Sequence, residues 1–424
     1  MTTTADDGHG LVSPASGAGG GRSVEVAGSL AGVEPSEWDA LSGDNALATH
    51  GWLRTIDTEA REFGKLEPRY VTVRDSGRLV GAAAFYRCEP GSRHFLPDHL
   101  MFGRARSWLG LAGASFLPAM TLGPVRCLGR PLLVDESLEP SRRAQVRGEL
   151  LDAVEAAARA EKLALHVPNL LADEQETQRL LRARGYHRTQ QFPVCFIDIE
   201  WSSFDGYLDH LASFSGNMPR NVRKEMRRCR KAGIVLRQID DPAAHDARLY
   251  ELADRHYRKL NASALPYSPR FFAGLQENLG RDLVLYGAFR GGGLIGFSLM
   301  LRRRRVGYLP LLGIDPETEA DSLYFSLCYY HPVADAVARG LKRLFVGRTN
   351  YHAKVRRGFR TMPVSSYYRA ASRSRHQAMR PWFAFHAAWM SRRVAPLLDL
   401  ARLRRYSAEP SRPSALTPPD ERRR

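Results

Sequence analysis

The feature that most constrains the fold of this chain is a pattern of strands that occurs twice. The stretch PRYVTVRDSGRLVGAAAFYRC, residues 68–88, predicts two strands joined by a tight turn at Asp75–Gly77, because apolar runs on both sides of turn-forming residues are typical of a hairpin. Residues 281–315 repeat this hairpin with a turn at Gly291–Gly293 and add a third strand after Arg305. The chain therefore contains two copies of an antiparallel strand unit.

The flanks of the two hairpins are also alike. A helical stretch precedes each hairpin, and a helix with a short strand follows it: residues 142–162 and LALHVPN in the first copy, residues 321–340 and KRLFVGR in the second. This order predicts an α+β fold, built as two tandem domains joined by a basic amphipathic helix. We expect a disordered leader (1–22), an N-terminal domain (23–200), a basic linker helix (201–232), a C-terminal domain (233–372), a basic aromatic helical tail (373–405) and a disordered end (406–424).

The joining segment is strongly basic. RNVRKEMRRCRK, residues 220–231, holds seven Arg or Lys residues and one acid, Glu225. On a helical wheel Val222, Met226 and Cys229 share one face, which predicts a helix packed against the protein body. Asn217 or Ser215 is expected to cap its start. The other face is either a solvated surface or a phosphate site, and repulsion between like charges favours a partner. The residues of this basic face are Arg220, Arg223, Lys224, Arg227, Arg228 and Lys231.

The composition agrees with an anionic partner. The 62 Lys plus Arg residues outnumber 45 Asp plus Glu, for a net charge of +17; such a chain attracts nucleic acid, anionic lipid or a phosphorylated ligand. The five cysteines are scattered without a CxxC pair, so we expect buried reduced thiols and no metal site. The sequence shows neither a signal peptide nor an apolar run long enough to cross a membrane. These features predict a cytoplasmic protein without a transmembrane segment.

The tail has a pattern of its own. PWFAFHAAWMSRRVAPLLDLARLRR places Trp382, Phe383, Phe385 and Trp389 beside Arg392 and Arg393 on a predicted helix. Aromatic residues next to arginines suit a helix docked on the protein body, and they also suit peripheral contact with an anionic membrane. Docking is our main expectation, with membrane association as the alternative.

Hairpin, helix and strand in this order resemble the GNAT acyltransferase fold. The duplicated form resembles the Fem-type peptidyltransferases and the related peptidoglycan-biosynthesis and BioF2-like acyltransferase families. The resemblance is carried by residues 207–236, by the hairpin 283–301, and by LYFSLCYYHPVADAVARGLKRLFVGRTNYHAKVRRGF (323–359). The last stretch is similar to a closing segment G-x-T-x-Y-x-x-K-x-x-x-G. Its motif positions here are Gly347, Thr349, Tyr351, Lys354 and Gly358.

The resemblance implies a cytoplasmic N-acyltransferase. It would move an acyl group from acyl-CoA or acetyl-CoA to an amine acceptor by direct attack, through a tetrahedral intermediate and without a covalent acyl-enzyme. The Fem-like alternative uses aminoacyl-tRNA as the donor. A second alternative is a noncatalytic basic module that binds nucleic acid or a membrane surface, although the basic segment lacks the aromatic residues expected of such a module.

The loop that would hold coenzyme A departs from the GNAT pattern. Ordinary members have a glycine-rich loop whose backbone amides hold the pyrophosphate at a helix start. Here the loop is GIDPETEADSLYFS, with no second glycine after Gly313 and with Asp315, Glu317 and Glu319 among its first residues. The backbone amides of residues 322–324 can still face an anion, but Glu317, Glu319 and Asp321 would repel it, which strengthens the aminoacyl-tRNA alternative.

Several residues are candidates for the chemistry. By resemblance, Lys354 works at the acyl donor, where a cation steadies an oxyanion or holds a phosphate; its alternative is a surface lysine. His352 is a candidate base and Tyr330 a candidate proton donor, with surface or core roles as alternatives, and Pro332 is expected to kink or end its helix. Backbone amides near residues 311–313 are the expected oxyanion donors. Besides the basic face, we predict that Gly313, Thr349, Tyr351 and Arg357 contact the donor.

Overall fold

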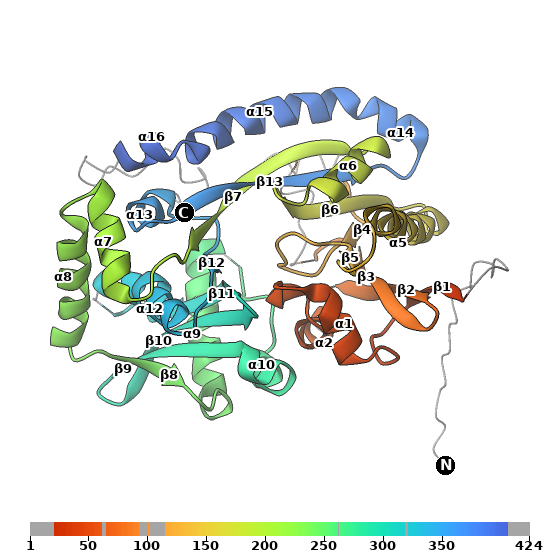
Figure 1. Cartoon of the computed structure of the whole chain (residues 1–424). Helices are drawn as coiled ribbons and strands as arrows, with labels where there is room; N and C mark the ends of the chain where they lie inside the picture. Colours follow the sequence, from red (N-terminus) through yellow and green to blue (C-terminus); the bar gives the residue numbers. More distant parts are fainter. Residues whose placement is uncertain are drawn as a thin grey trace, which may run out of the picture.

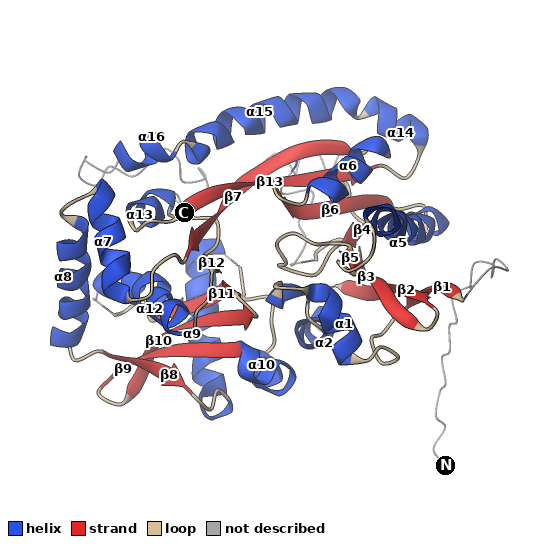
Figure 2. Ribbon diagram, viewed as in Figure 1, coloured by secondary structure: helices blue, strands red, loops and turns tan. Residues whose placement is uncertain are grey.

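The computed structural model describes residues 21–61, 65–92, 101, 115–261, 263–318 and 321–405. Nearly all of the predicted leader and the whole predicted end segment 406–424 lie outside these residues. The described part forms α-helices around one mixed β-sheet (Figures 1 and 2).

The sheet contains strands from both copies of the repeated pattern. Its neighbours run in the order β1-β2-β3-β4-β6-β13-β7-β12-β11-β10-β9-β8, and β5 pairs with β3 at the side. The strands are β1 (Arg22–Ala27), β2 (Leu66–Asp75), β3 (Arg78–Cys88), β4 (Ala119–Leu122), β5 (Leu133–Val134), β6 (Ala164–Leu171), β7 (His187–Asp198), β8 (Val235–Ile239), β9 (Leu283–Arg290), β10 (Gly293–Arg303), β11 (Val306–Ile314), β12 (Arg343–Phe345) and β13 (Arg360–Arg369).

Both predicted hairpins are confirmed. β2 pairs antiparallel with β3 and β9 with β10. The turn residues Ser76 and Gly77 have φ of 50° and 81°, and Gly291 and Gly292 have φ of 57° and 81°. A two-residue turn with positive φ at both positions matches the twist of its strands, so the local sequence fixes the register of each hairpin.

The two halves of the sheet are built alike and exchange one strand each. In each half an antiparallel run ends in a parallel pair, β4 with β6 and β11 with β12. The next place beside β6 is filled by β13 from the second half, and the place beside β12 is filled by β7 from the first half. β7 and β13 pair with each other at the centre. The strands of the two copies therefore form one continuous sheet.

Helices cover the sheet and join the halves. The first half carries α1 (Pro35–Ser42), η1 (Ala46–Ala48), α2 (His50–Glu59), α5 (Pro140–Ala160) and α6 (Gln175–Ala183). The second carries η4 (Ala243–His245), α9 (Asp246–Asn261), α10 (Phe271–Leu279), η5 (Gly280–Asp282), α11 (Asp321–Phe325), the π-helix η6 (Ser326–Tyr330), α12 (His331–Ala338) and α13 (Tyr351–Arg356). Between the halves lie α7 (Phe204–Phe214) and α8 (Met218–Lys231), and the tail forms α14 (Arg373–Ala378), α15 (Arg380–Leu398) and α16 (Leu400–Arg405).

A close helix contact fixes the two halves together. α2 packs against α10, and a side chain at Gly51 would lie 2.2 Å from the carbonyl oxygen of Asn278, so only glycine permits this approach. Trp52 of α2 and Phe272 of α10 are both buried in one hydrophobic cluster. Burial of apolar side chains from both halves in one core stabilises their relative position.

Of the two expectations for Pro332, a kink or an end of its helix, the second is wrong. The helix continues from α11 through η6 into α12, with Pro332 in the first turn of α12. The π-helix lies directly before it, and the His331 amide donates to the Ser326 carbonyl five residues earlier. Proline cannot donate a backbone hydrogen bond, and one wider turn accommodates it. π-segments of this kind are frequent at functional sites.

Candidate active site

Lys354 is buried next to the junction of the two halves. It lies on α13, which follows the short strand β12, and its side chain is only 2% exposed. Its Nζ is 4.0 Å from the position that a Cβ atom would take on Gly347. Within the described residues this ammonium group has no hydrogen bond and no ion pair. Lys354 is thus buried rather than at the surface, and nothing in that part of the chain neutralises its charge.

The surroundings of Lys354 are thiols instead of carboxylates. Burial lowers the pKa of Lys354 below its ordinary value of 10.5, and Cys195 and Cys328 act in the opposite direction. Burial raises the pKa of Cys195 to about 11 and that of Cys328 to about 12, so both thiols stay neutral at physiological pH. A buried cation without a countercharge is costly, and an incoming anionic group would relieve that cost.

Arg357, three residues further on, is held by a buried network. Its Nε donates to the Tyr330 hydroxyl at 2.6 Å, and its Nη2 donates to the Glu225 carboxylate oxygens at 3.0 and 3.1 Å. The Tyr330 hydroxyl donates to Glu225. The guanidinium also lies 3.6 Å from the centre of the Phe325 ring. Burial raises the pKa of Tyr330, so this hydroxyl keeps its proton and positions Arg357.

A second cluster of polar side chains, Asn350, Tyr324 and Tyr329, lies at the start of α13. The Asn350 side chain, at the start of α13, donates to the Tyr324 hydroxyl at 3.0 Å, and that hydroxyl lies 3.3 Å from the hydroxyl of Tyr329. Asn350 has φ of 54°, a left-handed conformation that asparagine adopts more readily than most residues. Sequence reasoning missed Asn350, Tyr324 and Glu225, although Glu225 was visible as the single acid in the basic segment.

The other predicted site residues lie in different surroundings. The Tyr351 hydroxyl donates to the Pro193 carbonyl at 2.8 Å, while Thr349 is exposed. The His352 Nδ1 lies 3.2 Å from the Leu403 carbonyl of α16, which ties His352 to the tail. A side chain at Gly313 would meet the backbone of α9 within 2.8 Å, so glycine is required there for packing. The structure brings Lys354, Tyr330, Tyr351 and Arg357 together around α13.

The basic helix α8 has the predicted two faces. Met218, Val222 and Cys229 are buried and Met226 is partly buried in the second core cluster. Gly233 follows the helix with φ of 69°. The expected side-chain cap is absent at Asn217, and Pro219 lies in the first turn, where its missing amide costs nothing. Seven cations are exposed: Arg220, Arg223, Lys224, Arg227, Arg228, Arg230 and Lys231.

The charge of this face is almost unopposed. Within the described residues only Arg223 has an ion-pair partner, the exposed Asp205 at 3.1 Å. The one acid of α8, Glu225, turns inward to Arg357. The face therefore offers a row of cations to solvent, as a phosphate-binding surface requires.

The acidic residues of the loop after β11 form bonds to α9 and within the loop. Asp315 binds Arg248 of α9 at 2.8 Å, and Glu317 binds Arg255 at 2.7 Å. The amide of Glu317 donates to the Asp315 side chain and that of Thr318 to the Asp315 carbonyl. The Asp315 amide donates to the Ile295 carbonyl. The backbone amides of this described part of the loop are therefore already in use, and they form no cradle for a pyrophosphate.

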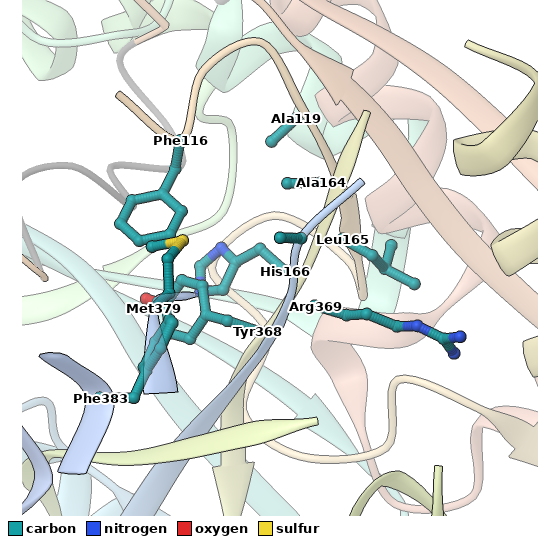
Figure 3. A pocket seen from close by; sticks show the side chains of 10 residues that line it. Phe116, Ala119, Ala164, Leu165, His166, Tyr368, Arg369, Met379 and Phe383 are labelled. Carbon is teal, nitrogen blue, oxygen red and sulfur yellow. The ribbon is translucent and has the colours of Figure 1, made fainter. Parts of the chain in front are cut away.

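A small cavity of about 10 Å³ lies where β4 and β6 of the first half meet β13 and the tail (Figure 3). His166, Tyr368, Phe116, Met379 and Phe383 line it. His166 is 2% exposed, and burial lowers its pKa to about 3. A cavity of this size holds about one water molecule, so it has no room for an acyl donor.

Three further observations concern partners. All five cysteines are buried free thiols. The described residues contain no group of three His, Cys, Asp or Glu side chains arranged to hold a metal ion. In the same part of the chain, no helix is both long and apolar enough to cross a membrane.

Comparisons with known proteins agree with this architecture. The sequence profile of the FemAB-like family, described as peptidoglycan biosynthesis/recognition, matches residues 29–403. A search of curated proteins gave no significant match. Among solved structures, FemX matches with a TM-score of 0.52 and 14% identity, over 80% of this chain and 96% of FemX.

Two further solved structures are less similar. The structure of L-PGS from Bacillus licheniformis gives a TM-score of 0.47 and 12% identity, over 83% of this chain and 96% of that one. A tandem GNAT protein from the clavulanic acid biosynthesis pathway gives 0.43 and 14%, over 82% and 99%. The FemX match shows a shared fold, and with the family match it confirms the predicted mixed α+β architecture.

Proposed function

The chain belongs to the FemAB-like family of peptidoglycan biosynthesis/recognition, and from this premise we propose that it transfers an aminoacyl group from aminoacyl-tRNA to the amine of a peptidoglycan precursor. Family and fold support an acyl- or aminoacyltransferase in general. The choice of donor and acceptor is our proposal.

The observation that carries the proposal is the buried, unopposed ammonium of Lys354. In the reaction, the acceptor nitrogen attacks the carbonyl carbon of the aminoacyl ester, and the carbonyl oxygen becomes an oxyanion. Collapse of this intermediate breaks the ester bond; the nitrogen loses a proton, and the departing ribose oxygen gains one. An ammonium group that meets the oxyanion in a dry site stabilises the transition state strongly. Lys354 has the charge and the burial for this role.

Two surfaces of the chain bear on the identity of the donor. The amides of Asp315, Glu317 and Thr318 in the loop after β11 are already bonded, which leaves fewer donors for the pyrophosphate of coenzyme A. The exposed cations of α8 suit the phosphates of an RNA, and α8 is connected to α13 through the bond between Glu225 and Arg357. The helix that carries the basic face is thus bonded to Arg357, three residues after Lys354.

An acyl-CoA or acetyl-CoA donor is the second candidate, and one observation favours it. β11 and β12 pair in parallel only as far as Tyr308 and Phe345, while β11 continues to Ile314. The edge of residues 309–312 on the side of β12 is therefore not paired with that strand. The amide groups of an extended acyl donor could form hydrogen bonds to this backbone edge.

Binding titrations of the full chain with bulk aminoacyl-tRNA and with coenzyme A, each at two salt concentrations, test the proposal. We expect salt-sensitive tRNA binding. Replacing Arg227 and Arg228 together by Gln should weaken it and reduce the slope of log K against log salt by about 1 for each phosphate that the variant no longer neutralises. The matched control is Arg304→Gln with Arg305→Gln, two adjacent exposed arginines in the β10–β11 turn.

The outcomes separate the candidates. Saturable coenzyme A binding that tolerates salt, without tRNA binding, would establish the second candidate. Equal loss of tRNA binding in the α8 variant and the control would remove α8 from the donor site. Absence of binding to both donors would favour a noncatalytic basic module that binds a membrane surface.

A further inference from the structure

The outer side of α15 has an unusual composition for a surface helix. α15 lies across β7 at the outside of the molecule (Figure 1), and its 19 residues include no Asp or Glu. One side is buried through Phe383, His386, Met390, Val394 and Leu397. The solvent side presents Ala384, Ala388, Ser391 and Ala395, where a solvated helix normally carries charged residues.

Large aromatic side chains flank this solvent side. The exposed large hydrophobic residues in the described part of the chain are Val235, Phe385 and Trp389, with exposures of 59%, 62% and 42%. Phe385 and Trp389 are one helical turn apart. The ring of Trp382 lies 5.8 Å from that of Phe385, so the three aromatics form a row along α15. Their exposure costs hydrophobic free energy unless another surface covers them.

Exposed arginines occur on all three tail helices, α14 to α16. Arg373, Arg380, Arg392 and Arg402 are exposed, and their side chains have no hydrogen bond or ion pair within the described residues. The guanidinium of Arg393 lies 4.6 Å from the ring of Trp389. Tryptophan and phenylalanine at the level of arginines are typical of a helix lying in a lipid headgroup region.

We propose that the outer side of α14 to α16 binds the surface of an anionic phospholipid bilayer, with Phe385 and Trp389 inserted and the arginines on the headgroup phosphates. A defined orientation of the enzyme follows. α16 packs on α13, and Leu403 contacts His352, so a bilayer bound to α15 fixes the direction that the Lys354 segment faces.

Vesicle flotation with the full chain tests this surface directly. We expect binding to vesicles of phosphatidylcholine mixed with phosphatidylglycerol, and little binding to phosphatidylcholine alone. The double variant Phe385→Ser with Trp389→Ser should bind the mixed vesicles at least about tenfold more weakly. Val235→Ser, which removes the third exposed hydrophobic side chain, is the matched control and should bind like the wild type. Circular dichroism confirms the fold of each variant.

A second variant tests the charges: Arg380→Gln with Arg392→Gln should lose the preference for phosphatidylglycerol. Equal binding of the wild type and the Ser double variant, or no vesicle binding by the wild type, would overturn the proposal. Sedimentation that shows a wild-type dimer and a monomeric Ser double variant, without vesicle binding, would assign the surface to a second copy of the chain instead. If the Ser double variant lost tRNA binding but still bound vesicles like the wild type, the membrane proposal would be overturned and the surface assigned to RNA.

Discussion

Each half of the sheet has one helix that follows its parallel strand, and the buried polar residues of these two helices differ in their hydrogen bonding. α6 follows the parallel strand β6 in the first half, and α13 follows β12 in the second. Both polar atoms of the buried Gln178 side chain on α6 have a partner: its Nε2 donates to the Leu171 carbonyl at 2.8 Å, and its Oε1 accepts from the Tyr367 hydroxyl at 3.1 Å. The buried Lys354 of α13 has no such bond in the described residues. A satisfied polar group stabilises its half, whereas an unsatisfied cation is available for chemistry.

The largest expected effect comes from removing the cation. Lys354→Met should reduce the rate of aminoacyl transfer by about 10²- to 10³-fold, the usual cost of a lost oxyanion donor. The same change should raise the free energy of unfolding by about 1 kcal/mol or more, because it removes a buried group without a partner. Transfer assays and denaturant titrations measure the two effects.

Lys342→Met is the control, since Lys342 is exposed, and it should change neither quantity. A Lys354→Met protein that transfers normally would refute the assignment. One that loses both activity and stability would place Lys354 among the structural residues, together with Gln178.

The network behind α13 should show the next largest effect. Glu225→Gln removes the carboxylate that pairs with the buried Arg357, and breaking such a pair costs about 3 kcal/mol of unfolding free energy. Adding Arg357→Met should restore part of the loss, as a double-mutant cycle measures.

Asp205→Asn breaks the exposed pair with Arg223 on the same pair of helices, and it should cost less than about 1 kcal/mol. Equal losses for Glu225→Gln and Asp205→Asn would mean that the inward network contributes no more than a surface ion pair.

The smallest effect on the transfer rate is expected in the first half. Gln178→Met leaves the Leu171 carbonyl and the Tyr367 hydroxyl without this partner, which should lower the unfolding free energy by about 1–3 kcal/mol. The transfer rate should stay within about twofold of the wild type, because a variant with a stability loss of this size remains folded. A large loss of rate with unchanged stability would assign chemistry to both halves.

Local sequence predicted the local structure well. The hairpins and the buried side of α8 follow from turn residues and apolar spacing, and these depend on neighbours within a few residues. Ser76 and Gly77, for example, adopt the positive φ that a tight hairpin turn needs. Short-range patterns of this kind are visible without any tertiary information.

Long-range pairings could not be predicted in the same way. β13 lies between β6 and β7, where Ser365 is the register partner of both Leu170 and Gln190, and no local pattern encodes this exchange. Likewise, Glu225 and Arg357 are 132 residues apart. Lys354 stands out through its motif, but its burial depends on β7 and η6, which are distant in sequence. Neighbours such as Arg356 instead suggest a surface position.

The central claim is that Lys354 is a buried cation without a countercharge, and the pH dependence of stability tests it most directly. Burial lowers the pKa of Lys354 in the folded protein below its ordinary value of 10.5, so the unfolded chain binds this proton more tightly than the folded protein does. The free energy of unfolding of the wild type should therefore rise with pH between the lowered pKa and pH 10.5. We would measure unfolding free energies of the wild type and Lys354→Met from neutral pH to about pH 10.5. We predict a more stable variant at neutral pH and a gap that closes as the pH rises. A variant that is less stable at neutral pH would contradict the claim.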